Sequence, residues 1–197
     1  MRDVLLATRN RGKLLELGSR LAGLPVRLHT LDEFSLPPVD ETGSTFEENA
    51  AIKAVHCSRL VDWLVLGEDS GLEVDALAGQ PGIQSARFGG PGLTDQQRCH
   101  LLLEKLEGTA WEERRARFVC VAVLAQGGQP RRTFRGTVEG LIAFEPRGTS
   151  GFGYDPVFYY PPGHRTFAEM TSDEKTAVSH RGKVLEQCVR YFEEMGG

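Results

Sequence analysis

The chain has 197 residues, of which 40% are hydrophobic and 25% charged, and its formal net charge is −4. This apolar content is ordinary for a globular fold and excludes a disordered tail protein. The acidic balance, with a pI of about 5.8, disfavours a nucleic-acid binder, whose surface is usually basic. The length predicts one domain, residues 1–197, with a core of its own.

Four cysteines lie far apart in the sequence, with no C-x-x-C pair and no histidine at zinc spacing. This pattern favours buried or idle thiols in a reducing compartment over disulfides or a zinc site. The apolar run Val4–Ala7 is too short for a signal peptide or a membrane span, and no other segment approaches membrane length. We therefore expect a cytoplasmic protein that binds no membrane.

The first part of the chain predicts a strand, a tight loop and a helix, followed by a second strand and a longer loop. Val4–Ala7 is a short continuous apolar run, which is typical of a buried strand. Leucines at helical spacing predict a helix over Lys13–Leu21, which Pro25 ends. Val26–Leu31 is expected to form a second strand, and the proline-rich, acidic segment Phe34–Gly43 to form a loop.

The next segment predicts a helix followed by a buried strand. Ser44 and Glu47 match a capping box, with Ser44 as the N-cap of a helix that runs to about Val61. Leu64–Leu66 is then expected as a strand that delivers an acidic segment at its end. Leu72–Val74 continues the sheet.

The middle of the chain predicts a loop, a helix and a hairpin. The segment Gly79–Gly92 is rich in glycine and proline and is expected to be a long surface loop. Thr94 and Gln97 form a second capping box that opens a helix. Ala116–Ala125 then faces Arg131–Glu139 across a glycine turn, which is typical of a β-hairpin.

The last third predicts a strand over Leu141–Phe144, a glycine loop over Gly148–Asp155 and a mostly helical segment over Ser172–Met195. Strands that alternate with helices, together with one antiparallel hairpin, indicate an α/β fold. We expect a mixed β-sheet flanked by helices.

A small-residue turn lies between the first strand and the first helix. Its residues are Thr8, Arg9, Asn10, Arg11, Gly12 and Lys13. A helix N-terminus points backbone N–H groups and a partial positive charge at whatever lies there, and Lys13 adds a cation. The spacing differs from that of a Walker A loop. The turn therefore predicts a phosphate-binding site, with an ordinary turn carrying solvated basic residues as the alternative.

Three carboxylates form a second group of candidates. Glu41 lies in the acidic loop, and Glu68 and Asp69 follow the predicted strand Leu64–Leu66. Ligand sites in α/β sheets gather beyond the carboxyl ends of strands, where Mg²⁺ binds one or two carboxylates with substrate phosphates and water. Asp69 would hold the metal or orient an attacking water. As the alternative, Asp69–Gly71 also matches a β-turn.

Two later segments carry aromatic and basic side chains. In the first, which contains Phe152, Gly153, Tyr154 and Asp155, glycines let a flat ligand approach, the aromatic rings offer stacking faces and the carboxylate could accept from a ring N–H. A turn with buried aromatics is the alternative.

The second is the basic group Lys175, Ser179, His180 and Arg181, which suits a polyanion or a base carbonyl. On one unbroken helix Arg181 would point away from Lys175. Either the helix breaks near Ser179, or only part of the group meets a ligand.

Six segments in order along nearly the whole chain resemble the inosine triphosphate pyrophosphatase family. They are residues 7–13 with Glu16, residues 41–54, Glu68–Leu72, Pro81–Arg87, Gly151–Pro156 and Ser179–Gly182. The resemblance implies an elongated α/β fold with two lobes and a central cleft. It also implies a homodimer that hydrolyses ITP, dITP and XTP to the monophosphate and pyrophosphate with Mg²⁺.

The resemblance also implies roles for individual residues. Asp69 is similar to the family's proton acceptor and metal ligand, and Glu41 or Asp40 supplies the second acidic ligand. Ser70 contacts substrate, and Thr8, Asn10 and Lys13 bind the triphosphate with Arg9, Arg11, Gly12 and Lys53. The base lies against Phe152, Gly153, Tyr154, Asp155, Lys175, His180 and Arg181.

Three other functions remain open from the sequence. A pyrophosphatase for modified pyrimidine or methylated nucleotides would use the same phosphate chemistry with a different base pocket. A sensor that binds a purine triphosphate without cleaving it is disfavoured because Lys13, Glu41 and Asp69 are all present. A nucleic-acid binder is disfavoured by the acidic balance.

Overall fold

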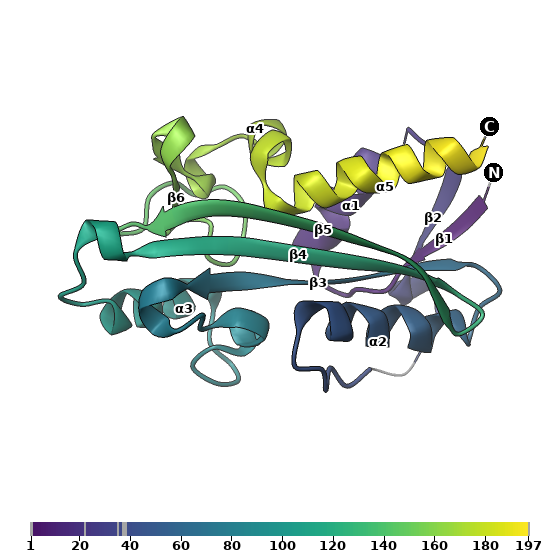
Figure 1. Ribbon diagram of the computed structural model, residues 1–197, viewed down its shortest axis with the longest axis horizontal. Coiled ribbons are helices and arrows are strands. Elements are labelled where there is room, and N and C mark those ends of the chain that lie inside the picture. Colours follow the sequence, from purple (N-terminus) through teal and green to yellow (C-terminus); the bar gives the residue numbers. More distant parts are fainter. Residues whose placement is uncertain (1, 22, 35, 37–38, 197) are drawn as a thin grey trace. The chain divides into compact units, whose positions relative to one another are not determined.

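Seven strands form one mixed sheet in the order β2-β1-β3-β4-β5-β6-β7 (Figure 1). The structure is a computed structural model that describes residues 2–21, 23–34, 36 and 39–196. β1 pairs in parallel with β2 and β3, whereas β6 pairs antiparallel with β5 and β7. The strands are β1 Arg2–Leu6, β2 Val26–Thr30, β3 Leu64–Val74, β4 Arg115–Gln126, β5 Gln129–Ile142, β6 Phe158–Tyr160 and β7 Arg165–Thr166. The predicted fold class is confirmed.

Helices connect the first four strands in turn, and two further helices follow the last strand. They are α1 Arg11–Leu21, α2 Phe46–Ser58, α3 Asp95–Lys105, α4 Ser172–Val178 and α5 His180–Gly196. Short 3₁₀ helices lie at Leu31–Glu33, Asp75–Leu77, Gly82–Arg87, Trp111–Glu113, Pro161–Gly163 and Phe167–Glu169. Among the described residues, no helix has the length and apolar content needed to cross a membrane.

The chain's internal contacts divide it into two units, and β3, β4 and β5 contribute residues to both. Unit 1 contains Met1–Asp69, Cys120–Gly136 and Arg181–Gly197. Unit 2 contains Ser70–Val119 and Thr137–His180.

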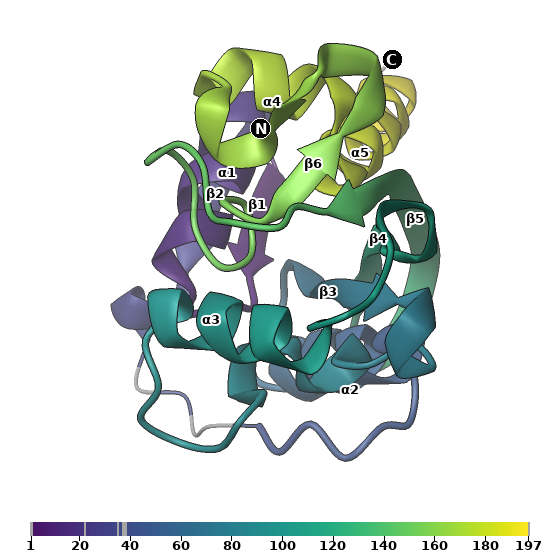
Figure 2. The ribbon, with the colours of Figure 1, turned by 90° about the vertical axis from the view of Figure 1, so that its left-hand side faces the viewer.

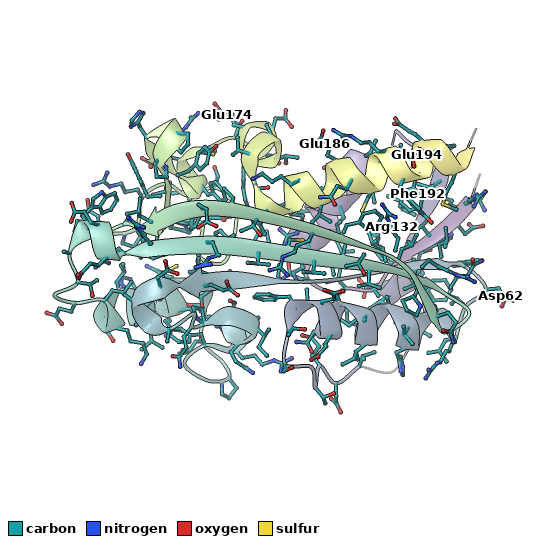
Figure 3. The ribbon with its side chains drawn as sticks, in the orientation of Figure 1. Asp62, Arg132, Glu174, Glu186, Phe192 and Glu194 are labelled. Carbon is teal, nitrogen blue, oxygen red and sulfur yellow. The ribbon has the colours of Figure 1, made fainter. Side chains whose placement is uncertain are left out.

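In unit 1, helices cover both faces of the parallel strands (Figure 1). Side chains alternate along a strand, so Leu6 and Leu66 point to one face and Leu5 and Val65 to the other. The first face packs against α1 and α5, with Phe192 of α5 buried at 2% exposure (labelled in Figure 3). The second face packs against α2.

Helix α2 lies directly on the backbone of β3. A Cβ atom added at Gly67 would come within 2.4 Å of the Ala50 carbonyl oxygen and 2.6 Å of the Ala54 nitrogen. No side chain fits in that space, so glycine is required there. The contact fixes the height of α2 above β3, and with it the position of Lys53, which α2 carries.

Unit 2 has a core of its own. Phe118, Phe158 and Phe167 pack with ring centroids 4.6 to 6.0 Å apart and are joined by residues of α3 and by Tyr154. Helices α3 and α4 lie on opposite sides of β4 and β5 (Figure 2). This core supports the loop that follows β5.

Two predictions for β3 and α2 are wrong. The predicted strand Leu64–Leu66 does not end before the acidic segment, and the alternative of a β-turn at Asp69–Gly71 is excluded, because β3 runs without a break to Val74. Parallel pairing with β1 nevertheless ends at the pair Leu6↔Leu66, so Asp69 still lies just beyond the parallel ladder. The N-cap of α2 is Thr45 and not Ser44, since the Thr45 side chain accepts from the Glu48 N–H.

Other segments also differ from the sequence-based expectation. The predicted surface loop Gly79–Gly92 contains the 3₁₀ helix Gly82–Arg87 and buries Ser85 and Phe88. Leu141–Phe144 is not a separate strand, because its first two residues end β5. The short strands β6 and β7 were not predicted, since strands of three and two residues leave no periodic pattern.

His29 makes the folding stability of unit 1 pH-dependent. Its ring bonds Asp3 at 2.8 Å and Glu33 at 2.9 Å and stacks on Trp63. The hydrogen bond with Asp3, followed by that with Glu33, raises the pKa of His29 above its ordinary value of 6.5. The bond to His29 lowers the pKa of Glu33 below its ordinary 4.5. The stabilisation of the folded state by charged His29 is therefore complete below pH 6.5, and it is lost as the pH rises through the raised pKa of His29. The stabilisation by charged Glu33 is complete above pH 4.5, and it is lost as the pH falls through the lowered pKa of Glu33.

We expect His29→Asn to destabilise the protein at pH 5.5 by less than about 1 kcal/mol and by a smaller amount at pH 8. Urea unfolding of both proteins at the two pH values measures the difference. An effect that is equal at both values, or larger at pH 8, would contradict the assigned role of His29.

Candidate functional site

The turn at residues 8–13 is held by its own side chains. The Thr8 hydroxyl accepts from the Asn10 N–H at 3.2 Å, and the Asn10 side-chain oxygen accepts from the Lys13 N–H at 3.1 Å. Asn10 therefore acts as the N-cap of α1. In both bonds the side-chain oxygen is the acceptor. The Thr8 hydroxyl and the side-chain amide of Asn10 can therefore still donate hydrogen bonds. In the described chain, the N–H groups of Arg11 and Gly12 have no hydrogen-bond partner.

Arg9 braces the same turn against a second loop. Its guanidinium donates to the carbonyl oxygen of Leu36 at 3.0 Å. Arg9 is exposed, so a ligand could still approach its other N–H groups.

Lys13 and Lys53 approach the acidic residues of β3 from different helices. The Lys13 ammonium lies 3.1 Å from Glu68. The Lys53 ammonium donates to Glu41 at 3.1 Å and to Asp69 at 3.2 Å. Glu41 rather than its exposed neighbour Asp40 reaches Lys53. The structure thus brings the predicted residues Lys53, Glu41 and Asp69 together, and it places Lys13 of the predicted phosphate turn against Glu68, the neighbour of Asp69 in β3.

Asp69 is a buried carboxylate in which one of the two oxygens accepts a hydrogen bond. Its Oδ1 accepts from Lys53, whereas its Oδ2 has no hydrogen-bond partner among the described residues. Burial raises the pKa of the Asp69 carboxyl above its ordinary value, and the ammonium groups of Lys53 and Lys13 oppose that rise. A buried unpartnered oxygen costs free energy, and a bound cation or a proton would remove that cost.

The donor set of Asp69 and Glu41 fits a hard cation such as Mg²⁺. The two carboxylates meet at Lys53, and Oδ2 of Asp69 is available. Among the described residues, no group of three or more metal-ligating side chains occurs. A Mg²⁺ site does not require three protein side chains, because Mg²⁺ binds one or two carboxylates and completes its coordination shell with water and substrate phosphates.

The loop that contains Glu41 and Gly43 is joined to α2 by Asn49, a residue that the sequence analysis did not identify as a contributor to the site. Asn49 is buried at 2% exposure, and its side-chain oxygen accepts from the Gly43 N–H at 2.8 Å. This bond anchors the loop that carries Glu41, two residues before Gly43. Gly43 and Asn49 lie six residues apart in the sequence, but a single sequence does not show that the loop folds back to bring them together.

In unit 2, the loop over residues 151–155 is folded around its own aspartate. Oδ2 of Asp155 accepts from the Phe152 N–H at 2.9 Å and from the Lys175 ammonium at 2.6 Å. Lys175 Nζ also lies 4.8 Å from the centre of the Phe152 ring. The three predicted residues Phe152, Asp155 and Lys175 therefore lie together, with Lys175 and Asp155 both buried.

Tyr154 is buried, which agrees with the alternative of a turn with buried aromatics for this residue. Its ring is 4% exposed within the core of unit 2, and its hydroxyl donates to the Ser85 carbonyl oxygen at 2.8 Å. Asp95 of α3 accepts from the Gly153 N–H at 2.8 Å. Tyr154 and Asp95 thus hold the loop from beneath, and Phe152 remains the half-buried aromatic ring of this segment.

The helix breaks at Ser179, which resolves one alternative left open by the sequence. Ser179 has extended backbone angles and separates α4 from α5. His180 stacks on Phe118 in unit 2 with ring centroids 4.7 Å apart. Arg181 lies in unit 1, where its guanidinium contacts Glu16 and Glu68.

Ser70, which was predicted to contact substrate, is half-buried within β3 in unit 2.

A turn at a helix N-terminus, two lysines and a buried aspartate beyond a parallel ladder are typical of enzymes that act on phosphate groups with a divalent cation. The chain belongs to the Ham1 family, whose model matches residues 4–191. This membership covers almost the whole length.

Curated relatives and solved structures agree with that membership. A dITP/XTP pyrophosphatase of Exiguobacterium sp. is 49% identical over 183 residues, which cover 92% of each chain. One of Thermus thermophilus is 47% identical over 191 residues, covering 97% of this chain and 92% of the relative. The structure of a HAM1 protein from Coxiella burnetii is similar with a TM-score of 0.91 at 43% identity, covering 98% of this chain and 100% of that one.

Proposed function

We propose that this protein hydrolyses the deaminated purine nucleotides ITP, dITP and XTP to the monophosphate and pyrophosphate. The observation that carries the proposal is the buried Asp69 carboxylate, which Lys53 contacts through one oxygen while the other oxygen stays available. The family membership and the names of the relatives support the substrate class. Removal of these nucleotides would keep them out of DNA and RNA.

In the proposed reaction, water attacks the α-phosphorus and the bond from that phosphorus to the pyrophosphate oxygen breaks. Asp69 accepts the proton of the attacking water. Lys13 and Lys53, with the N–H groups of residues 11 and 12, bind the phosphate oxygens. Asp69 and Glu41 would hold Mg²⁺, which when bound would neutralise charge on the phosphates.

We propose that the base lies against Phe152 and that Lys175 donates to its 6-oxo group. Inosine and xanthosine carry an acceptor there, whereas adenosine carries an amino donor. Adenine would leave a buried donor unpaired, and such rejection can reach roughly 10⁴-fold. The contacts of Lys175 with Asp155 and with the Phe152 ring support this assignment. The resemblance separately implies that His180 contacts the base.

We also propose that residues 1–197 act as one domain, in a cytoplasmic homodimer. β3, β4 and β5 run through both units, which supports a single domain. All four cysteines are free and buried, as expected in a reducing compartment. The homodimer follows from the resemblance, and light scattering of the purified protein measures it.

Incubation of the purified protein with ITP, XTP, dITP, ATP, GTP and dUTP, with and without Mg²⁺, tests the function. We expect monophosphate and pyrophosphate from the first three, only with Mg²⁺, and little product from the others. Equal cleavage of all six would overturn the base assignment. Cleavage of dUTP alone would favour a pyrimidine pyrophosphatase, and tight binding without cleavage would favour a sensor.

Lys175→Gln should raise the KM for ITP by about tenfold or more while kcat falls much less, because a charged hydrogen bond is worth about 1.5–3 kcal/mol in binding. Glutamine retains a donor for Asp155, so the loop stays folded. Steady-state kinetics measure both constants. Lys105→Gln, at an exposed lysine of α3, is the control and should change neither. A fall confined to kcat would show that Lys175 acts on the reacting atoms instead.

A further inference from the structure

The loop over residues 151–155 in unit 2 turns at Gly153, which packing alone does not hold. Its φ is 62°, in the left-handed region that favours glycine. A Cβ atom added at Gly153 would meet nothing within 4 Å, so the space around its α-carbon is open. A glycine in open space can rotate about its backbone bonds. Hydrogen bonds to its two peptide groups therefore have to fix its conformation.

Helix α3 supplies hydrogen bonds to both of these peptide groups. Oδ2 of Asp95 accepts from the Gly153 N–H at 2.8 Å, and the Cys99 thiol donates to the Gly153 carbonyl oxygen at 3.4 Å. Burial, with the nearby carboxylates of Asp95 and Asp155, raises the pKa of Cys99 to about 12, so the thiol keeps its proton. Because each peptide group is planar, the two bonds fix the backbone on both sides of Gly153.

Asp95 is free to serve the loop because other residues cap α3. Thr94 and Gln97 form the complete capping box of this helix. The side chain of Asp95 is 58% exposed, so it does not fill the core, and its second oxygen lies 3.8 Å from Arg98. A carboxylate that accepts from a backbone N–H makes a stronger bond than a neutral acceptor does. The bond to Gly153 is therefore the specific contact that Asp95 provides.

The peptide that Asp95 holds also belongs to Phe152. On its other side, Phe152 is held by Asp155, whose Oδ2 accepts from the Phe152 N–H at 2.9 Å. The Phe152 ring centre lies 4.8 Å from Lys175 Nζ. Asp155 and Asp95 thus fix the backbone before and after this ring. Loss of Asp95 would release only the second side, which is the side next to the flexible glycine.

We propose that Asp95 is a positioning residue for recognition of the base. It fixes the peptide between Phe152 and Gly153, and in this way it keeps the Phe152 ring beside Lys175, where the base stacks. All of these residues belong to unit 2. The proposal rests on the proposed function, since it assumes that the base lies against Phe152.

Calorimetric titration with inosine monophosphate, and separately with pyrophosphate in Mg²⁺, tests the proposal without turnover. Asp95→Ala removes the acceptor and should weaken binding of inosine monophosphate about tenfold, while pyrophosphate binding stays unchanged. Asp95→Asn retains a side-chain oxygen that can accept from Gly153 and should bind inosine monophosphate nearly as well as the unmodified protein. Glu104→Ala removes an exposed carboxylate of the same helix and is the matched control, which should change neither affinity.

A second substitution tests whether Asp95 acts through the ring. In a Phe152→Ala background, Asp95→Ala should have little further effect on inosine monophosphate binding, because coupled residues are not additive. Full additivity would overturn the proposal, as would an equal loss of pyrophosphate binding in Asp95→Ala. A role confined to the dipole of α3 predicts that Asp95→Asn, which lacks the charge, binds as weakly as Asp95→Ala. That result would also overturn the proposal.

Two further measurements use the unmodified protein. If it binds pyrophosphate but no inosine monophosphate, the base assignment of the proposed function fails, whereas the outcomes above concern Asp95 alone. Should Asp95→Ala not fold by circular dichroism, amide hydrogen exchange of the unmodified protein decides. The Gly153 N–H should exchange more slowly than solvent-exposed loop amides, because it is hydrogen-bonded to Asp95. Exchange as fast as theirs would contradict the proposal.

Discussion

Replacing Asp69 with asparagine is expected to lower kcat for ITP by about 10³-fold, within the range that a general base contributes. Asparagine has the same shape, and its side-chain oxygen can still accept from Lys53 at the position of Oδ1. It lacks the negative charge and the basic oxygen at Oδ2. Nucleotide affinity should therefore be kept while the chemical step is lost.

Single-turnover kinetics and equilibrium binding of ITP to Asp69→Asn, at several Mg²⁺ concentrations, measure the two effects separately. Asp62→Asn removes an exposed carboxylate of unit 1 and serves as the control (labelled in Figure 3). Unchanged turnover in Asp69→Asn would remove Asp69 from the reaction.

Gly67→Ala should destabilise the protein by about 3 kcal/mol or more, the upper part of the range for overpacking. The added methyl would meet the backbone of Ala50 and Ala54, which cannot move without displacing α2. Any folded protein that remains should also lose activity, because α2 carries Lys53. Urea unfolding gives the stability, and assays below the unfolding midpoint give the activity.

Gly18→Ala is the matched comparison for this variant. Gly18 lies in α1 with nothing within 4 Å of an added Cβ. Alanine there should stabilise the helix by roughly 0.5–1 kcal/mol. If both substitutions changed stability in the same direction, the close contact between α2 and β3 would not be the cause.

Much of the fold followed from apolar periodicity, but β3 did not. Glu68–Gly71 has the composition of a turn, and sequence reasoning therefore ended the strand before it. The strand continues because Glu68 and Asp69 are each paired by residues distant in the sequence, 113 positions away for Arg181 and 16 for Lys53. Tertiary pairing overrides local preference here, and a single sequence carries no record of it.

The start of α2 shows a different limit. Ser44 and Thr45 are each followed three residues later by a glutamate, so two capping boxes one residue apart fit equally well. Thr45 is the cap in the structure, and this register buries Phe46 and brings Asn49 onto Gly43. Core packing decides between the two frames.

The basic group after α4 was predicted as one set, yet its members have different partners. Lys175 faces Asp155 and Phe152, whereas Arg181 faces Glu16 and Glu68. The break at Ser179 makes this possible, because it frees α5 from the helical phase of α4. The residue types alone suggested an anion or a carbonyl group as the partner of every member. The break at Ser179 determines which partner each side chain reaches.

The self-bonded turn at residues 8–13 has a consequence for the thermodynamics of binding. Since Thr8 and Asn10 already fix the backbone through Asn10 N–H and Lys13 N–H, the conformational entropy of this segment is lost on folding and not on ligand capture. A triphosphate would meet donors that need no rearrangement. Because the turn is already ordered, the affinity for a phosphate group should depend little on loop motion, and association should be fast.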